Sequence, residues 1–276
     1  MRHLILLLLL CVTAQAQWPQ GKNSAYLKLG TWNQHSVHHF ETNGNISEPG
    51  GLRTYFIPAL YARVGIDDKW TVTGFVPVVN TSQFIETTNG GFTIEDTNLG
   101  DINIFVERLL LKLDTGFHVG AELGFGLPTG FTGIGLSGFP SPVGSGDGEF
   151  NQIISLKVGS GFKIGEQNLY YKASLGYNNR TQGFLNEYRW SAETGTTFNK
   201  LFVLSRITNI TALNKENVTV NANNIFGNGI EKRVLGFEAT YNLTKHWGIS
   251  AGYNRFLSGT LVFSDPSYTY GVVYQF

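Results

Sequence analysis

The 276 residues include 20 basic and 20 acidic ones, 14% charged residues in all, together with 34 glycines and 13% aromatic residues. This sparse and balanced charge gives no support for a nucleic-acid partner. The single cysteine, Cys11, lies in a segment expected to be removed, so disulfides, zinc–thiolate sites and cysteine nucleophiles are excluded from the mature chain. No run of about 18 apolar residues follows that segment, and no transmembrane helix is predicted.

Residues 1–16 have the pattern of a cleaved secretory signal. A short polar start precedes an apolar run over 4–12, and Ala14-Gln15-Ala16 has the small-x-small pattern of a signal-peptidase site. The apolar run is too short to cross a bilayer. A leucine stands before Cys11, where lipoprotein processing would need a small residue. We therefore predict export, with residues 17–276 forming a single domain.

Period-two alternation then recurs along the chain. Over 117–127 the odd positions are apolar, and the even positions are histidine, glutamate and glycine; 169–180 and 188–198 repeat the pattern. Glycines, lone charges and hydroxyls on one face are typical of a watery lumen, while the apolar face would meet lipid. Strands are expected at 24–38, 52–66, 70–79, 99–110, 117–128, 152–164, 169–180, 187–198, 201–211, 234–243, 247–256 and 267–276.

The connections between these strands alternate in length. Tight turns are predicted around 67–69, 112–116, 165–168, 199–200 and 244–246, and longer segments lie between them. Short periplasmic turns and long extracellular loops give this pattern, and a Greek-key sandwich does not. We predict an all-β, transmembrane, antiparallel up-and-down barrel of about 12 strands, of the outer-membrane type, in a Gram-negative-type bacterium.

The end of the chain supports this fold. From Tyr268 to Phe276 the even positions are aromatic or valine, up to a terminal phenylalanine. This resembles the C-terminal signal by which outer-membrane barrels are recognised, so the barrel-assembly machinery is an expected partner. Outer-membrane lipid and lipopolysaccharide are the others, together with a small-molecule solute that the sequence does not identify.

Three short motifs suggest a family. They are Leu99-Gly100-Asp101, Pro128-Thr129-Gly130 and Gly144-Ser145-Gly146-Asp147-Gly148, in this order. The order resembles outer-membrane proteins named for the meta-pathway of phenol degradation, over about residues 55–200. The resemblance implies a channel or transporter-like barrel for small molecules, hydrophobic ones among them.

Charged residues at inward positions are the candidates for a solute pathway. They could form a mixed-charge constriction that selects solutes, or a salt-bridged network that braces the wall, because charges at membrane depth need water or a partner. The sequence leaves both hypotheses open. The candidates are Asp101, Glu107, His118, Glu122, Lys157, Lys172, Arg180, Arg189, Glu193, Arg206 and Glu238.

Other motifs have simpler interpretations. His35, His38 and His39 could bind a metal but lack a recognisable ligand spacing, so solvent-facing loop residues are expected. The glycine-rich 133–138 segment matches a dinucleotide fingerprint without the helix that this motif needs. Asp147 and Glu149 lack the spacing of a calcium loop. No metal and no cofactor are predicted.

A channel or transporter is the leading function, and no enzyme activity is predicted. The alternatives are a lipid-modifying enzyme and a structural or adhesive barrel. The enzyme would need a serine brought to a base, with His118 and Glu122 near Ser155, Ser174 or Ser191. The adhesive barrel would act through the loops 80–98, 129–151 and 212–233.

Overall fold

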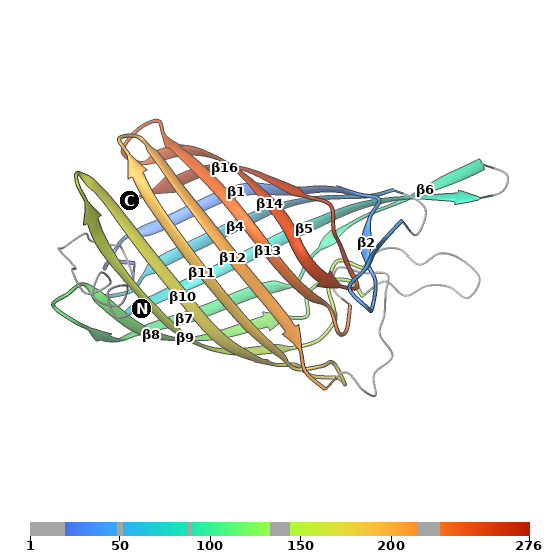
Figure 1. Ribbon diagram of the computed structural model, residues 1–276, viewed down its shortest axis with the longest axis horizontal. Helices are drawn as coiled ribbons and strands as arrows, with labels where there is room; N and C mark the ends of the chain where they lie inside the picture. The colour runs from blue at the N-terminus through green and yellow to red at the C-terminus, as the bar shows by residue number, and fades with distance from the viewer. Residues whose placement is uncertain (1–19, 49–51, 88–89, 133–143, 215–226) are drawn as a thin grey trace.

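The computed structural model describes residues 20–48, 52–87, 90–132, 144–214 and 227–276, so the predicted signal segment lies outside the described residues. Twelve antiparallel strands of the described chain form one closed sheet, in which each strand pairs with its neighbours and β4 pairs with β5 to complete the ring (Figure 1). They are β1 (Ala25–Ser36), β4 (Arg53–Gly65), β5 (Trp70–Thr87), β7 (Ile102–Lys112), β8 (Phe117–Leu127), β9 (Asn151–Ile164), β10 (Gln167–Asn179), β11 (Glu187–Phe198), β12 (Leu201–Ala212), β13 (Glu231–Asn242), β14 (Trp247–Thr260) and β16 (Ser267–Gln275).

The predicted strands, turns and closure are confirmed. Short turns join β4 to β5, β7 to β8, β9 to β10, β11 to β12 and β13 to β14, and they lie at the end of the barrel that also holds the C-terminus (Figure 1). We call this the short-turn end and the opposite one the long-loop end. Within the described residues, no helix is long and apolar enough to cross a membrane.

The two faces of the wall differ as a membrane barrel requires. Lipid-facing side chains such as Leu29, Ile154 and Leu175 are 64%, 57% and 61% exposed. The side chains with least exposure are mostly polar, among them Glu107, Asn178 and Glu193. A soluble sandwich would bury its apolar face instead, so this distribution follows the lipid-facing arrangement of outer-membrane barrels.

The long-loop end contains two further structures that the sequence did not predict. β5 continues past residue 79, and β6 (Gly90–Leu99) pairs with it from Val78 to Thr87, so the expected loop 80–98 is a hairpin that projects beyond the barrel (Figure 1). A three-stranded mouth sheet consists of β2 (His39–Phe40), β3 (Ile46–Ser47) and β15 (Val262–Phe263). Apolar side chains hold the mouth sheet to the barrel, with Phe40, Leu261 and Val262 packed against Ile230.

Candidate functional site

One cavity of about 1410 Å³ occupies the inside of the barrel. Its lining includes Ser24, Lys245 and His246 at the short-turn end, and Asp147 and Gly227 at the long-loop end. The same cavity therefore reaches residues at both ends of the wall.

A ring of ion-paired side chains, the charged belt, lies on the inner face of the wall. It contains five cations and four carboxylates, so its formal charge is 5 − 4 = +1. Nine of the twelve barrel strands contribute one residue each. Its members are Lys28, Arg63, Glu107, Glu122, Lys157, Lys172, Glu193, Arg206 and Glu238.

Glu193 is at the centre of the part of the belt that borders the cavity. Its carboxylate is 2.8 Å from the hydroxyl of Tyr170, 3.0 Å from Nζ of Lys172 and 2.5 Å from Nε of Arg206. Lys172, Glu193 and Arg206 are paired across three adjacent strands, which places the three side chains in one row. Gly195 provides room for this row, because a Cβ there would lie 2.6 Å from the ring of Tyr170.

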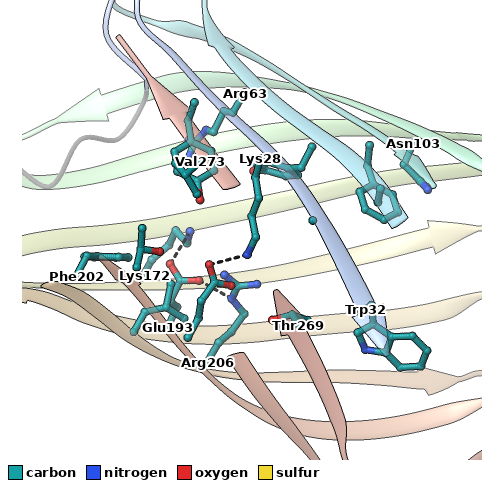
Figure 2. Close-up of a pocket in the computed structure, with 18 of the residues that line it drawn as sticks. Lys28, Trp32, Arg63, Asn103, Lys172, Glu193, Phe202, Arg206, Thr269 and Val273 are labelled. Carbon is teal, nitrogen blue, oxygen red and sulfur yellow. Dashed lines mark hydrogen bonds and ion pairs between the residues drawn. The ribbon is translucent and has the colours of Figure 1, made fainter. Parts of the chain in front are cut away.

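A second pair of the belt joins strands that are not neighbours. Nζ of Lys28 on β1 lies 2.7 Å from Oε1 of Glu238 on β13, and β14 and β16 stand between these strands in the sheet. Figure 2 shows Lys28 extending from its strand to the group that contains Glu193 and Arg206. This pair therefore narrows the lumen at the level of the belt.

The remaining members of the belt brace the opposite wall. Glu107 accepts from Nζ of Lys157 at 3.0 Å and lies 3.5 Å from Arg63, and Lys157 also pairs with Glu122. The side chains of Glu107 and Glu122 are only 4% and 12% exposed. Neither they nor Lys157 line the cavity. Part of the predicted set thus forms a bracing network in the wall, and part lines the cavity.

The three motifs behind the family resemblance meet at the long-loop end. The carboxylate of Asp101 accepts from the backbone N–H groups of Gly130 and Asp147, each at 2.9 Å. The hydroxyl of Thr129 donates to the carbonyl of Gly100, and that of Ser145 donates to the carbonyl of Leu99. We call this group the loop anchor. Asp101, expected on a strand, precedes β7, and burial raises its pKa to about 6.

Arg180 ties a second set of loop residues together. Its guanidinium donates to Asp147 at 2.8 Å, to Glu187 at 2.9 Å and also to Glu149, whose side chain is fully buried. Burial raises the pKa of Glu149. The structure places Arg180 just beyond the end of β10, whereas the sequence predicted it within the strand. Asp147 and Glu149, which the sequence predicted as plain loop residues, are therefore ion-paired with Arg180.

The two other predicted residues line the cavity. Arg189 donates to Glu187 at 2.6 Å, and His118 is buried in the lining. In the described part of the chain, none of the three inward serines is hydrogen-bonded to His118. Ser174 and Ser191 instead bond each other at 2.7 Å. The arrangement predicted for an enzyme, one of these three serines beside His118, is therefore not formed in the described residues.

Of the three clustered histidines, His35 is exposed as expected, whereas His38 and His39 are not. His39 is buried in the mouth sheet, with its ring 5.4 Å from that of Phe263. His38 lies 2.9 Å from Asp265 and 2.9 Å from Glu48, and the hydrogen bond to Asp265 raises its pKa. Among the residues with described positions, no group of three or more ligating side chains could hold a metal ion.

Sequence reasoning missed two belt residues, Lys28 and Arg63. The first strand alternates poorly in sequence, because Tyr26 and Trp32 also point into the lumen and give its inner face an aromatic character. The even spacing of Tyr26, Lys28 and Gly30 on one face could have identified Lys28. Nothing in the sequence shows that Arg63 faces Glu107, since β5 separates their strands.

Comparison with known proteins supports the architecture. No protein-family model and no curated protein matches the sequence significantly. A crystal structure of an outer membrane channel from Pseudomonas putida F1 is similar, with a TM-score of 0.66 and 11% identity over 96% of this chain and 100% of that one. This chain has the outer-membrane barrel fold. The β domain of the Bordetella autotransporter BrkA is also similar, with a TM-score of 0.51 and 11% identity over 92% of this chain and 100% of that one.

Proposed function

We propose that this protein is an outer-membrane channel that lets small, water-soluble molecules diffuse through its lumen. The observation that carries the proposal is the cavity of about 1410 Å³, whose lining reaches both ends of the barrel. A barrel of about twelve strands encloses more space than its inward side chains can fill, and less than a 16-strand porin. Such a lumen suits small solutes.

The charged belt supports a hydrophilic cargo. Lys28, Glu193 and Arg206 border the cavity where the Lys28–Glu238 pair narrows it. An apolar molecule that passed this level would remove water from ionised groups at a large cost. Trp32, Ile57 and Val79 line the long-loop half, so a polar solute with an apolar portion would also find a matching wall. This lining supports polar solutes over the hydrophobic ones that the resemblance implies.

The loop anchor supports membership in the phenol meta-pathway group of barrels. Backbone N–H groups of the second and third motifs donate to Asp101, and the hydroxyls of Thr129 and Ser145 donate to carbonyls of the first motif, so the three motifs form one structural unit. The similarity to the channel of Pseudomonas putida F1 concerns the fold and is compatible with this assignment. The short-turn end with the C-terminus would then face the periplasm.

Single-channel recording of the refolded mature protein in a planar bilayer tests the proposal. We expect steady conductance from the native protein. Lys28→Met should raise the conductance, because the cross-lumen pair is lost, and should shift the reversal potential towards cations, because the belt charge falls from +1 to 0. Leu29→Ala, on the lipid-facing side of the same strand, is the matched control and should leave both quantities unchanged.

The contrary result is also clear. A heat-modifiable barrel that gives no conductance would indicate a closed lumen and contradict the channel proposal. The enzyme and the structural or adhesive barrel would then become the leading hypotheses.

A further inference from the structure

Two arginines stand on the outer, lipid-facing surface of the barrel. In β14, Asn254 and Phe256 line lumenal cavities, so Arg255 between them points outwards, where it is exposed. In β13, Lys232 lines the lumen and the adjacent Arg233 is exposed on the outer face. Both arginines lie in the long-loop half of their strands.

The two strands bring these arginines close together. Arg255 pairs with Leu235, and Arg233 pairs with Ser258. The register shifts between Arg233 and Val234, which marks a β-bulge beside the pair. Diagonal neighbours on one face of a sheet lie about 7–8 Å apart, and long side chains reach across that distance. Bulges re-aim side chains, and here the guanidinium of Arg233 lies over β12 and β11, beside Asn209 and Trp190. The two guanidinium groups therefore occupy neighbouring positions on the outer face, one on each side of β13, where each can bind a separate phosphate.

The height of the pair corresponds to a membrane interface. Trp247, at the start of β14, packs on Tyr274 with ring centroids 4.7 Å apart, in the aromatic girdle of the short-turn end. Arg255 is eight residues further along the strand, or about 26 Å at 3.3 Å per residue. With a strand tilt near 40°, this corresponds to about 20 Å of height in an apolar band about 25 Å tall.

The surroundings indicate a lipid headgroup. Tyr253 and Tyr268, one step below Arg255 on the same face, have ring centroids 5.6 Å apart. The guanidinium of Arg233 lies 5.8 Å from the ring of Trp190, and its Nε is 3.2 Å from Oδ1 of Asn209. Tyrosine and tryptophan gather at the headgroup level of membranes. The pair therefore lies where polar headgroups meet the apolar band.

The guanidinium of Arg255 has no hydrogen bond or ion pair to another residue in the described part of the chain. Glu231, further along β13, is engaged by the backbone N–H of Ala212 and the hydroxyl of Thr260. A cation on the lipid-facing surface is expensive unless a partner neutralises it. At the level of the headgroups, an anionic lipid phosphate can supply that partner.

We propose that Arg233 and Arg255 form a binding site for the phosphate groups of lipid A, the phosphorylated glycolipid of the outer leaflet. Guanidinium groups bind phosphate through paired, charge-assisted hydrogen bonds. The acyl chains would lie along the apolar face below, over Leu235 and Phe237. The site rests on the outer-membrane setting of the proposed function, and it does not require that the lumen conducts.

Binding of bis-phosphorylated lipid A to the refolded mature protein in detergent, measured by native mass spectrometry, tests the site. We expect the native protein to bind this lipid at least tenfold more tightly than lipid A without its phosphates. The double variant Arg233→Leu/Arg255→Leu should lose that preference. Arg108→Leu is the matched control, because Arg108 is also exposed and stacks on Trp70 at the opposite end of the barrel. It should retain the preference.

Competition with inorganic phosphate shows whether the site recognises the whole lipid or only a phosphate group. We expect lipid A to stay bound in millimolar phosphate. The proposal is overturned if the double variant keeps the phosphate preference, if Arg108→Leu loses it equally, or if free phosphate displaces the lipid. The double variant should conduct like the native protein, because neither side chain faces the lumen. If the channel proposal is wrong and the lipid site is real, the native protein should show no conductance but should still bind lipid A.

Discussion

Glu193→Gln is the substitution that tests the charged belt most directly. The side chain of Glu193 is 5% exposed, and its carboxylate accepts from Tyr170, Lys172 and Arg206. A glutamine has nearly the same shape, but its amide is neutral and offers one acceptor oxygen where the carboxylate offers two. Lys172 and Arg206 would then lose their shared negative partner, while the packing of the inner wall would stay the same.

The expected loss of stability follows from the burial of each group. Removing one partner of a buried ion pair costs about 3–5 kcal/mol, because the other charge is left uncompensated. Here the side chains of Lys172 and Arg206 are 30% and 47% exposed, so water in the lumen offsets part of this cost. Exposed pairs contribute at most about 1 kcal/mol. We expect the free energy of unfolding to fall by about 2–3 kcal/mol.

The assay is denaturant unfolding of the refolded barrel, followed by tryptophan fluorescence, together with the reversal potential across a salt gradient. The substitution changes the belt charge from +1 to +2, so the reversal potential should shift towards anions. Glu166→Gln, in the exposed β9–β10 turn, is the control and should change stability by less than about 0.5 kcal/mol. If Glu193→Gln matches this control in both measurements, the reasoning about the belt is refuted.

Three further predictions concern the long-loop end. The pKa of Asp101 is raised from its ordinary 3.8 to about 6, so its contribution to stability is greatest at low pH and is lost as the pH rises through 6. In Asp101→Asn, the free energy of unfolding measured between pH 4 and 8 should lose this dependence on pH. Gly146→Ala should destabilise the loop anchor by about 1–3 kcal/mol, because its Cβ would contact the Asp101 carboxyl group, and faster limited proteolysis of the loop would show it. Arg180→Lys keeps the charge but loses the fork that reaches three carboxylates, so heat modifiability should shift to lower temperature, while unchanged values would show that the fork is dispensable.

Much of the fold was predictable because lipid and a watery lumen impose strict local rules. Each strand must alternate, each short turn must be polar, and closure permits no free edge, so the alternation around Phe117 or Leu169 indicates both strand and facing. The hairpin of β5 and β6 escaped prediction, since outside the membrane neither face of a strand must be apolar. Residues 80–98 therefore lack the alternation that marks the strands of the wall.

The sequence by itself determined the closed barrel, its two ends and most of the inward charges. Only the tertiary structure decided which charges meet. Lys28 and Glu238 are 210 residues apart in the chain, and curvature of the wall brings their side chains to 2.7 Å. Period-two alternation shows the face of the sheet on which a side chain lies. It does not show the position of that side chain along the barrel axis, or its partner across the lumen. These depend on the register and closure of all twelve strands, which no local pattern specifies.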